Sequence, residues 1–268
     1  WFFFFNMTKV SIATWNVNTI RARLNGLLKW LKKNNPDILL LQELKAQEDD
    51  IPRTELEDLN YNFITFGQKA YNGVAILSKY PVSDITYNLP NFSQDKQSRY
   101  IEGFINLDKK GIRVASIYAP NGNPINSEKY NYKIEWLKKF CNHAEKLLDF
   151  EEYTFLGGDF NICPKSFDAA DENLLVNDAI YTTDVKSIYS NIINSGYYDS
   201  FRSINPDMPG FTYWDYGQSF KNDIGVRIDH FLLSPYALDK VDKVYVDKEP
   251  RAWQKPSDHT PLVLEIEI

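Results

Sequence analysis

Short runs of hydrophobic residues, separated by polar and charged ones, predict that strands and helices are mixed along the whole chain. Residues 9–14 alternate between apolar and polar side chains, and residues 37–41 form a short apolar run after Pro36, so both segments are predicted to be strands. Residues 24–31 and 129–148 have the three- and four-residue spacing of amphipathic helices. The same criteria predict further strands at 61–66, 73–77, 100–107, 112–118, 153–156, 211–214, 227–233 and 262–268, and a further helix at 184–194.

A turn motif and the number of strands indicate how these elements are arranged. Asp108-Lys109-Lys110-Gly111 lies between two expected strands with its glycine placed for the turn, which predicts a hairpin. Hairpins interleaved with helices are typical of α+β domains with largely antiparallel sheets. Roughly ten strands are more than one flat sheet carries easily, so we expect two packed sheets. No Gly/Ser-rich or Pro-rich linker divides the chain, so we expect one domain over residues 7–268.

Composition places this domain among ordinary globular proteins. Apolar residues make up 43% and charged residues 25% of the chain. Two cysteines, Cys141 and Cys163, are too few for a disulfide framework, so we expect a reducing, cytoplasmic environment. No window has the run of about 20 apolar residues that a membrane helix needs. Residues 1–5 are all aromatic and precede Asn6 and Met7, so we expect residues 1–6 to be a non-native or disordered extension.

The net charge of −6 and the pI of about 5.2 count moderately against a nucleic-acid partner. Net charge averages over the whole surface, however, whereas affinity depends on the local footprint. An acidic pocket that holds a metal ion would also lower the total without repelling phosphate.

Several polar clusters lie at the ends of the predicted apolar strands. A strand end is where a rigid sheet can present a side chain to a cleft. The clusters are Thr14-Trp15-Asn16-Val17-Asn18, Leu41-Gln42-Glu43, Tyr118-Ala119-Pro120-Asn121, Gly157-Gly158-Asp159-Phe160-Asn161, Arg227-Ile228-Asp229-His230 and Pro256-Ser257-Asp258-His259.

Each cluster also has a purely structural interpretation. Glu43 ends a buried strand, where a carboxylate is costly without a partner; it is either a solvated strand end or a ligand of a cation. Asp159 and Asn161 share a face in extended chain and suit binding of water and phosphate, but Gly, Asp and Asn are also turn residues. His259, beside Asp258, suits phosphate or proton chemistry, with Asp229 as a candidate orienting acid.

The chemistry that these residues share is phosphodiester hydrolysis with a hard metal. No Cys/His zinc spacing, phosphate-binding Gly-Lys-Ser/Thr loop or Gly-x-Ser-x-Gly elbow occurs. His143 and His230 fall within a helical and a strand pattern, so we expect structural roles for both. Oxygen ligands favour Mg²⁺ or Mn²⁺ over Zn²⁺. The candidate ligands are Glu43, Asp258, Asp159, Asn16 and Asn161.

The order and spacing of the clusters resemble the exonuclease III family of abasic-site endonucleases, within the endonuclease/exonuclease/phosphatase superfamily. The resemblance runs from about Lys9 to the C-terminus. It rests on Trp15-Asn16-Val17-Asn18, Leu41-Gln42-Glu43-Leu44-Lys45, Tyr118-Ala119-Pro120-Asn121, Gly158-Asp159-Phe160-Asn161, Arg227-Ile228-Asp229 and Lys255-Pro256-Ser257-Asp258-His259. It implies a four-layer α/β/β/α sandwich, called DNase I-like, with the site at one rim. It also implies an intracellular, bacterial-type monomer that acts on double-stranded DNA with abasic sites or 3′ ends.

The resemblance also implies a role for each matching residue. Glu43 would be the main metal ligand, with Asn16 and Asp258 nearby, and Asp159 would activate the attacking water or protonate the leaving group. Asn161 would stabilise the transition state. Tyr118 and His259 would contact the phosphate, with Asp229 orienting His259. Three further positions match residues near the metal or the DNA backbone, namely Lys45, Arg99 and Asn121.

Tyr118 distinguishes between branches of the superfamily. Pancreatic-type DNases and sphingomyelinases carry a histidine at this strand end, whereas abasic-site enzymes carry tyrosine as this chain does. Phe211-Thr212-Tyr213-Trp214 resembles the aromatic strip beside the abasic sugar, which predicts that Tyr213 and Trp214 contact DNA; core aromatics on a strand are the alternative. This chain departs from the family at two places. Val226 stands where some relatives carry a large aromatic residue in the pocket wall, and the only positively charged residue of the loop 164–184 is Lys165.

Two other functions compete with an abasic-site nuclease. A superfamily phosphodiesterase or phosphatase acting on a lipid or small phosphoester fits the acidic net charge, but Tyr118 disfavours it. A non-enzymatic binding module would have lost Glu43, Asp159 or His259, and all three are present.

Overall fold

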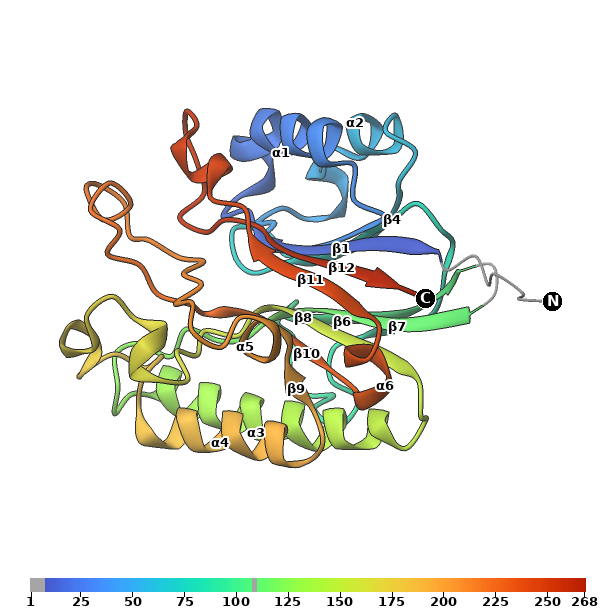
Figure 1. Cartoon of the computed structure of the whole chain (residues 1–268). Helices are drawn as coiled ribbons and strands as arrows, with labels where there is room; N and C mark the ends of the chain where they lie inside the picture. Colours follow the sequence, from blue (N-terminus) through green and yellow to red (C-terminus); the bar gives the residue numbers. More distant parts are fainter. Residues whose placement is uncertain (1–7, 108–109) are drawn as a thin grey trace.

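Two six-stranded sheets pack face to face in the computed structural model of the protein, which describes residues 8–107 and 110–268 (Figure 1). The first sheet has the strand order β11-β12-β1-β2-β4-β3. Its strands are β1 (Lys9–Asn16), β2 (Ile38–Gln42), β3 (Asn62–Phe66), β4 (Val74–Ser78), β11 (Val241–Val246) and β12 (Leu262–Glu267). β1 and β2 run parallel, and the other neighbouring pairs are antiparallel.

The second sheet has the strand order β5-β6-β7-β8-β10-β9. Its strands are β5 (Val82–Tyr87), β6 (Tyr100–Leu107), β7 (Lys110–Tyr118), β8 (Tyr153–Asp159), β9 (Tyr198–Asp199) and β10 (Asp229–Leu233). Here β7 and β8 are the parallel pair. Both sheets are therefore mixed.

Helices cover the outer faces of the two sheets (Figure 1). α1 (Ile20–Asn34) and α2 (Arg53–Glu57) lie over the first sheet, and α3 (Glu128–Leu148) and α4 (Thr183–Asn194) lie over the second. The shorter helices are α5 (Ser200–Ile204), α6 (Pro235–Leu238), η1 (Glu48–Asp50), η2 (Ser166–Asp168), η3 (Glu172–Leu175) and η4 (Glu249–Ala252). The four layers confirm the predicted α/β/β/α sandwich. Across residues 8–107 and 110–268, no helix has the length and apolarity to span a bilayer.

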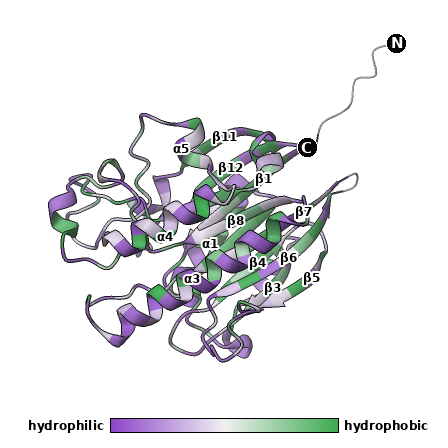
Figure 2. Ribbon diagram, turned by 90° about the horizontal axis from the view of Figure 1, so that it is seen from below, coloured by the Kyte–Doolittle hydropathy of each residue, from purple (hydrophilic) through white to green (hydrophobic). Residues whose placement is uncertain are grey.

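Alternation along the strands produces three buried layers of apolar side chains. Ile12 and Leu40 point between the sheets, whereas their neighbours Ala13 and Leu41 pack under α1. A third layer lies between the second sheet and the helices α3 and α4, where Trp136 is fully buried. Figure 2 shows the result as hydrophobic colour along the central strands and alternating hydrophilic and hydrophobic colour on α3.

A few contacts fix how closely the sheets approach. A Cβ atom built on Gly157 of β8 would lie 2.3 Å from Cε1 of Phe231 and 2.8 Å from Cδ1 of Leu40 in the opposite sheet. Nearby, Gln42 donates from Nε2 to Oγ of Ser116 over 2.9 Å, which joins β2 to β7 through the core. The absence of a side chain at Gly157 therefore permits close packing, and the Gln42–Ser116 bond satisfies polar groups that this packing buries.

Several predicted elements need correction. Residues 211–214 are not a strand: Tyr213 makes only isolated bridges to Val226 and His259. The helix predicted at 24–31 begins at Ile20 and ends at Asn34. The strand predicted at 153–156 continues through both glycines to Asp159, so the alternative of a simple turn at this motif is wrong. The predicted turn includes residues 108–109, and the predicted extension comprises residues 1–6; both lie outside the described residues.

Candidate active site

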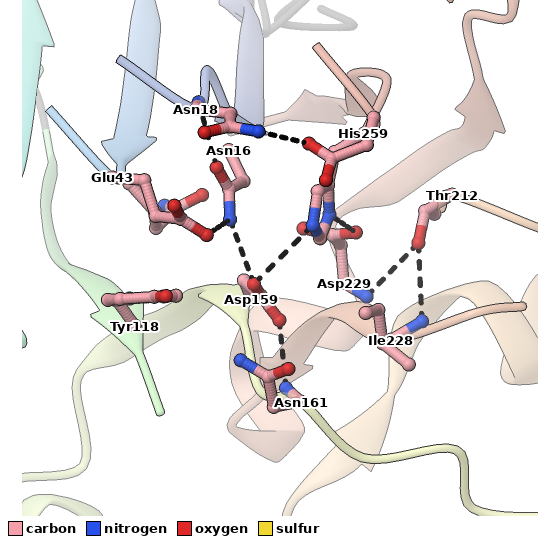
Figure 3. A network of polar contacts seen from close by, with 12 residues as sticks. Asn16, Asn18, Glu43, Tyr118, Asp159, Asn161, Thr212, Ile228, Asp229 and His259 are labelled. Atoms are coloured by element: carbon pink, nitrogen blue, oxygen red, sulfur yellow. Dashed lines mark hydrogen bonds and ion pairs between the residues drawn. The ribbon is translucent and has the colours of Figure 1, made fainter. Parts of the chain in front are cut away.

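Side chains from both sheets meet at one rim of the sandwich, as Figure 3 shows. From the first sheet come Asn16 at the end of β1, Glu43 directly after β2 and His259 before β12. From the second sheet come Tyr118 at the end of β7, Asp159 at the end of β8 and Asp229 at the start of β10. The site thus exists only where the two sheets are packed together.

Strand register explains why residues distant in sequence become neighbours. The parallel strands β1 and β2 end together, because Asn16 pairs with Gln42. In the second sheet Asp159 pairs with Tyr118 on one side and with Asp229 on the other. The predicted site residues at these strand ends are therefore brought together by the backbone pairing itself.

Asn16 connects the acidic residues at the centre of the site. Its Nδ2 donates to Oε1 of Glu43 over 2.8 Å and to Oδ2 of Asp159 over 2.9 Å. Asn16 itself is fully buried. Because its amide is occupied as a donor, Asn16 supports the two carboxylates that it joins.

Three of the side chains form a group that can hold a metal ion. One ligand atom each from Glu43, Asp159 and His259 lies within 4.8 Å of the others. Lys45 neutralises part of this acidic group, since its Nζ lies 2.6 Å from Oε2 of Glu43. Carboxylate oxygens suit a hard divalent ion. These side chains therefore form a possible metal site, and the identity of the ion stays a prediction.

His259 is held by a carboxylate on each side. Its Nδ1 lies 2.8 Å from Oδ2 of Asp229, and its Nε2 lies 3.7 Å from Oδ2 of Asp159. Burial alone would lower the pKa of His259, but the charges of Asp229 and Asp159 outweigh burial and raise it. The Oγ1 of Thr212 in turn accepts from the backbone N–H of Asp229 over 3.1 Å, which holds the backbone of the residue whose carboxylate orients the ring.

Asp159 is a deeply buried acid of the site, with 1% of its surface exposed. Burial raises its pKa, and the carboxylates of Asp229 and Glu43 add to that effect, against the opposing influence of His259. Its Oδ1 accepts from the backbone N–H of Asn161 over 2.8 Å. A carboxyl group whose pKa is raised toward neutrality is suited to gaining and losing a proton.

Tyr118 lies beside Glu43 and borders an open cleft. Burial raises the pKa of Tyr118, and the charges of Glu43 and Asp159 raise it further, so the phenol keeps its proton. Arg99 stacks over the Tyr118 ring at 4.9 Å and donates to the Tyr118 carbonyl over 3.3 Å. The cleft has a volume of about 380 Å³, and its lining includes Glu43, Lys45, Arg99, Tyr118 and Asn121.

A model of the endonuclease/exonuclease/phosphatase family matches residues 13–259, which include every one of these side chains. The chain belongs to this family.

Individual relatives agree with the family match. Exodeoxyribonuclease III from Haemophilus influenzae is 30% identical over 265 residues, which cover 96% of this chain and 99% of that protein. The solved structure of an AP endonuclease from Archaeoglobus fulgidus is 34% identical with a TM-score of 0.91, covering 97% of this chain and 100% of that one. A 3′-5′ exonuclease from Neisseria meningitidis is 33% identical with the same TM-score and coverage. The family predicted from the strand-end motifs is confirmed.

Some predicted site residues of this family member lie further from the centre. Asp258 is not part of the compact acidic group; its Oδ1 accepts from Nδ2 of Asn18 over 3.0 Å. Asn161 donates from Nδ2 to the Ala119 carbonyl over 2.9 Å. Asn121 is exposed, and its Nδ2 donates to Oδ1 of Asn161 over 3.4 Å. Direct metal binding by Asp258 and Asn161 therefore stays a prediction.

The two aromatic residues predicted to contact DNA differ in their surroundings. Tyr213 is partly exposed and packs edge-on against His259 at 5.0 Å. Trp214 is fully buried and packs against Phe220 at 5.2 Å, so its ring cannot reach DNA in this structure. The alternative interpretation of this segment, core aromatic residues, therefore holds for Trp214. His143 and His230 are also buried, against Glu102 and Arg227 respectively, as their predicted structural roles require.

Several residues support the site in roles that the sequence did not predict. Asn18 accepts from Nζ of Lys45 over 2.7 Å, and Thr212 supports Asp229. Lys133 lies buried beneath the site and donates to the main chain of Asn161. The sequence signal that could have found Lys133 is its place in the apolar stripe of α3, which continues through Trp136, Leu137 and Phe140.

Proposed function

We propose that this family member is a DNA repair nuclease that acts as a monomer and hydrolyses the phosphodiester bond on the 5′ side of abasic sites. It would also process 3′ ends. The observation that carries the proposal is the convergence of Glu43, Asp159 and the Asp229–His259 pair beside Tyr118. The likeness to an exodeoxyribonuclease III, an AP endonuclease and a 3′-5′ exonuclease supports it.

The proposed cofactor is Mg²⁺ or Mn²⁺, held by Glu43 with Asp159 and Asn16 nearby. When bound, such an ion supplies positive charge that stabilises the charge developing on the phosphate oxygens. Lys45 already pairs with Glu43, so in the absence of the ion its ammonium balances the carboxylate.

Asp159 and Asn161 would act on the attacking water. Asp159 is buried and its pKa is raised, so it can accept the water proton as the new P–O bond forms. The bond from phosphorus to the 3′ oxygen of the preceding nucleotide breaks in the same displacement, and that leaving oxygen takes up a proton from water. The backbone N–H of Asn161 holds one oxygen of Asp159 and leaves Oδ2 directed toward Asn16 and His259. This arrangement keeps the base in one orientation before substrate arrives.

His259 and Tyr118 would stabilise the phosphate during attack. Both side chains carry a proton, because burial and then nearby carboxylates raise the pKa of Tyr118, and because carboxylates outweigh burial and raise the pKa of His259. Asp229 holds the Nδ1 side of the imidazole, which leaves Nε2 directed toward the centre of the site. Fixed donors of this kind stabilise a transition state without reorganising, which is electrostatic preorganisation.

Selectivity for an abasic nucleotide would come from the energetic cost of unstacking. A nucleotide without a base swings out of the helix at little cost, whereas an intact nucleotide must unstack and unpair. The partly exposed ring of Tyr213 beside His259 would contact the abasic sugar. Since no base edge needs to be read, we expect low sequence specificity.

A phosphodiesterase or phosphatase acting on lipids or small phosphoesters is the second candidate, and the net charge of −6 favours it. Cleavage of a duplex containing tetrahydrofuran should be compared with hydrolysis of sphingomyelin and inositol phosphates, each with Mg²⁺ and with EDTA. We expect metal-dependent cleavage of the duplex alone. Asp159→Asn should abolish it, whereas Asp149→Asn, an exposed aspartate at the end of α3, should not. Faster hydrolysis of the small phosphoesters would favour the second candidate.

A further inference from the structure

Lys133 is a buried charged residue that the proposed mechanism does not use. It lies on α3, its side chain is fully buried, and burial lowers its pKa to about 7. Burial of an ammonium group is costly unless hydrogen bonds replace its water. The position it occupies would suit an apolar residue, so its retention there needs an explanation.

The hydrogen bonds of Lys133 go to the main chain of the two loops that form the site. Its Nζ donates to the Asn161 carbonyl over 2.6 Å and to the Asn121 carbonyl over 3.0 Å. Asn161 lies two residues after Asp159, the last residue of β8, and Asn121 lies three residues after Tyr118, the last residue of β7. One ammonium group therefore joins the loops at the ends of both parallel strands.

The loop at Asn161 needs such support. Asn161 has a φ of 49°, in the left-handed region that non-glycine residues seldom adopt. Its N–H is held by Asp159 and its carbonyl by Lys133, so both sides of this residue are fixed by charged groups. Bonds from charged groups are the stronger class of hydrogen bond. The orientation of Asp159 and the conformation of Asn161 are thus tied to the position of Nζ.

The chain also leaves room for the lysine stem. Gly122 has a φ of 86°, and a Cβ atom there would lie 2.5 Å from Cδ of Lys133. A side chain at this position would displace the lysine from the two carbonyls. The chain thus leaves space for the aliphatic part of the Lys133 side chain and places two carbonyls at its end, which indicates a specific role for the amine.

We propose that Lys133 is a positioning residue for catalysis, which holds the Asn121 and Asn161 loops so that Asp159 and Asn161 face the scissile phosphate. The inference rests on the proposed nuclease function. It assigns to α3, on the outer face of the second sheet, a role in the geometry of the site. The alternative is that the contacts only anchor α3 to the sheet, in which case the loss of Lys133 would affect stability and leave the chemical step unchanged.

The test compares Lys133→Met with Lys138→Met, an exposed lysine on the same helix. Single-turnover rates on an abasic duplex at saturating Mg²⁺ measure the chemical step, and the Kd for the duplex in EDTA measures binding. For Lys133→Met we expect a rate loss of about 30-fold or more with a Kd within about threefold of wild type, because bonds from a charged donor are lost behind the site. Lys133→Arg, which restores charge and donors, should recover part of the rate.

Three outcomes would overturn the inference: a wild-type rate in folded Lys133→Met, an equal loss in Lys138→Met, or a loss of affinity that accounts for the whole effect. If Lys133→Met does not fold, Gly122→Ala displaces the lysine from the two carbonyls without removing it, and a wild-type rate in that variant would equally overturn the inference. A wild-type protein that fails to cut the abasic duplex would instead refute the proposed function, so the two failures are distinguishable.

Discussion

The pairing of His259 with Asp229 predicts that their contributions to catalysis are not additive. The bond between Nδ1 and Oδ2 is 2.8 Å long and both side chains are buried. A hydrogen bond to a charged group is worth about 1.5–3 kcal/mol, which corresponds to roughly a 10- to 150-fold change in rate. We therefore expect Asp229→Ala to slow the reaction by that factor, because the imidazole stays but loses its orientation.

His259→Ala should cost more, about 10²- to 10⁴-fold, because the group that contacts the phosphate is lost. Once the ring is absent, Asp229 has nothing left to orient. The double variant should therefore be no slower than His259→Ala by more than about threefold, as is usual for residues that act as a unit. Single-turnover rates on an abasic duplex at saturating Mg²⁺ measure all four corners of this cycle.

His143 provides a matched control for the loss of a buried histidine. Its Nε2 lies 2.8 Å from Oε2 of Glu102, a pair of the same length beneath α3. His143→Ala should lower the thermal stability and leave the rate within about threefold of wild type. If the losses from His259→Ala and Asp229→Ala multiply in the double variant, the two residues act independently and the proposed pair must be abandoned.

Three further predictions concern metal binding, DNA binding and pH. Glu43→Gln should weaken Mg²⁺ or Mn²⁺ binding at least about tenfold by calorimetry with the fold intact, and an unchanged affinity would remove Glu43 from the metal site. The Kd for DNA should change with salt as for about three to five phosphate contacts, since the chain has 30 basic and 36 acidic residues; a log–log slope near about −10 would reveal a broad basic footprint. Burial and the charge of Arg227 lower the pKa of His230 from 6.5 to about 4. The unfolded chain alone binds that proton between these values, so the free energy of unfolding of wild type relative to His230→Gln should fall by about 3 kcal/mol as the pH drops through them; parallel curves in urea titrations would contradict this.

The predicted strands succeed where one face of a segment is buried and fail where most of the residues are exposed or half-exposed. β6 has its predicted bounds because its buried residues leave a clear apolar pattern. β5 and β11 were missed, and both are edge strands with mostly exposed or half-exposed residues. Residues 211–214 are rich in aromatic and β-branched side chains, yet their backbone makes only isolated bridges, to Val226 and His259, and no continuous ladder. Local sequence does not contain the tertiary contact that decides such cases.

The candidate site was predictable to the extent that its residues end strands. Glu43, Asp159 and His259 come from such motifs, and the structure brings them together. Asn18 and Thr212 act through hydrogen bonds to residues that are far away in the sequence, and no spacing rule finds such partners. Lys133 broke the apolar stripe of α3, and that local inconsistency is the kind of departure that accompanies functional sites.

The division of the site between two sheets makes the apolar core part of the catalytic apparatus. Asn16 spans the junction, and its two bonds join Glu43 of one sheet to Asp159 of the other. A substitution that pushes the sheets apart, such as a larger residue at Gly157 against Leu40, would lengthen these two hydrogen bonds. It would do so without replacing any polar residue of the site. Among variants that fold but are inactive, we therefore expect substitutions in the apolar core between the sheets as well as at the rim. The spacing between the sheets therefore serves the chemistry as well as the packing.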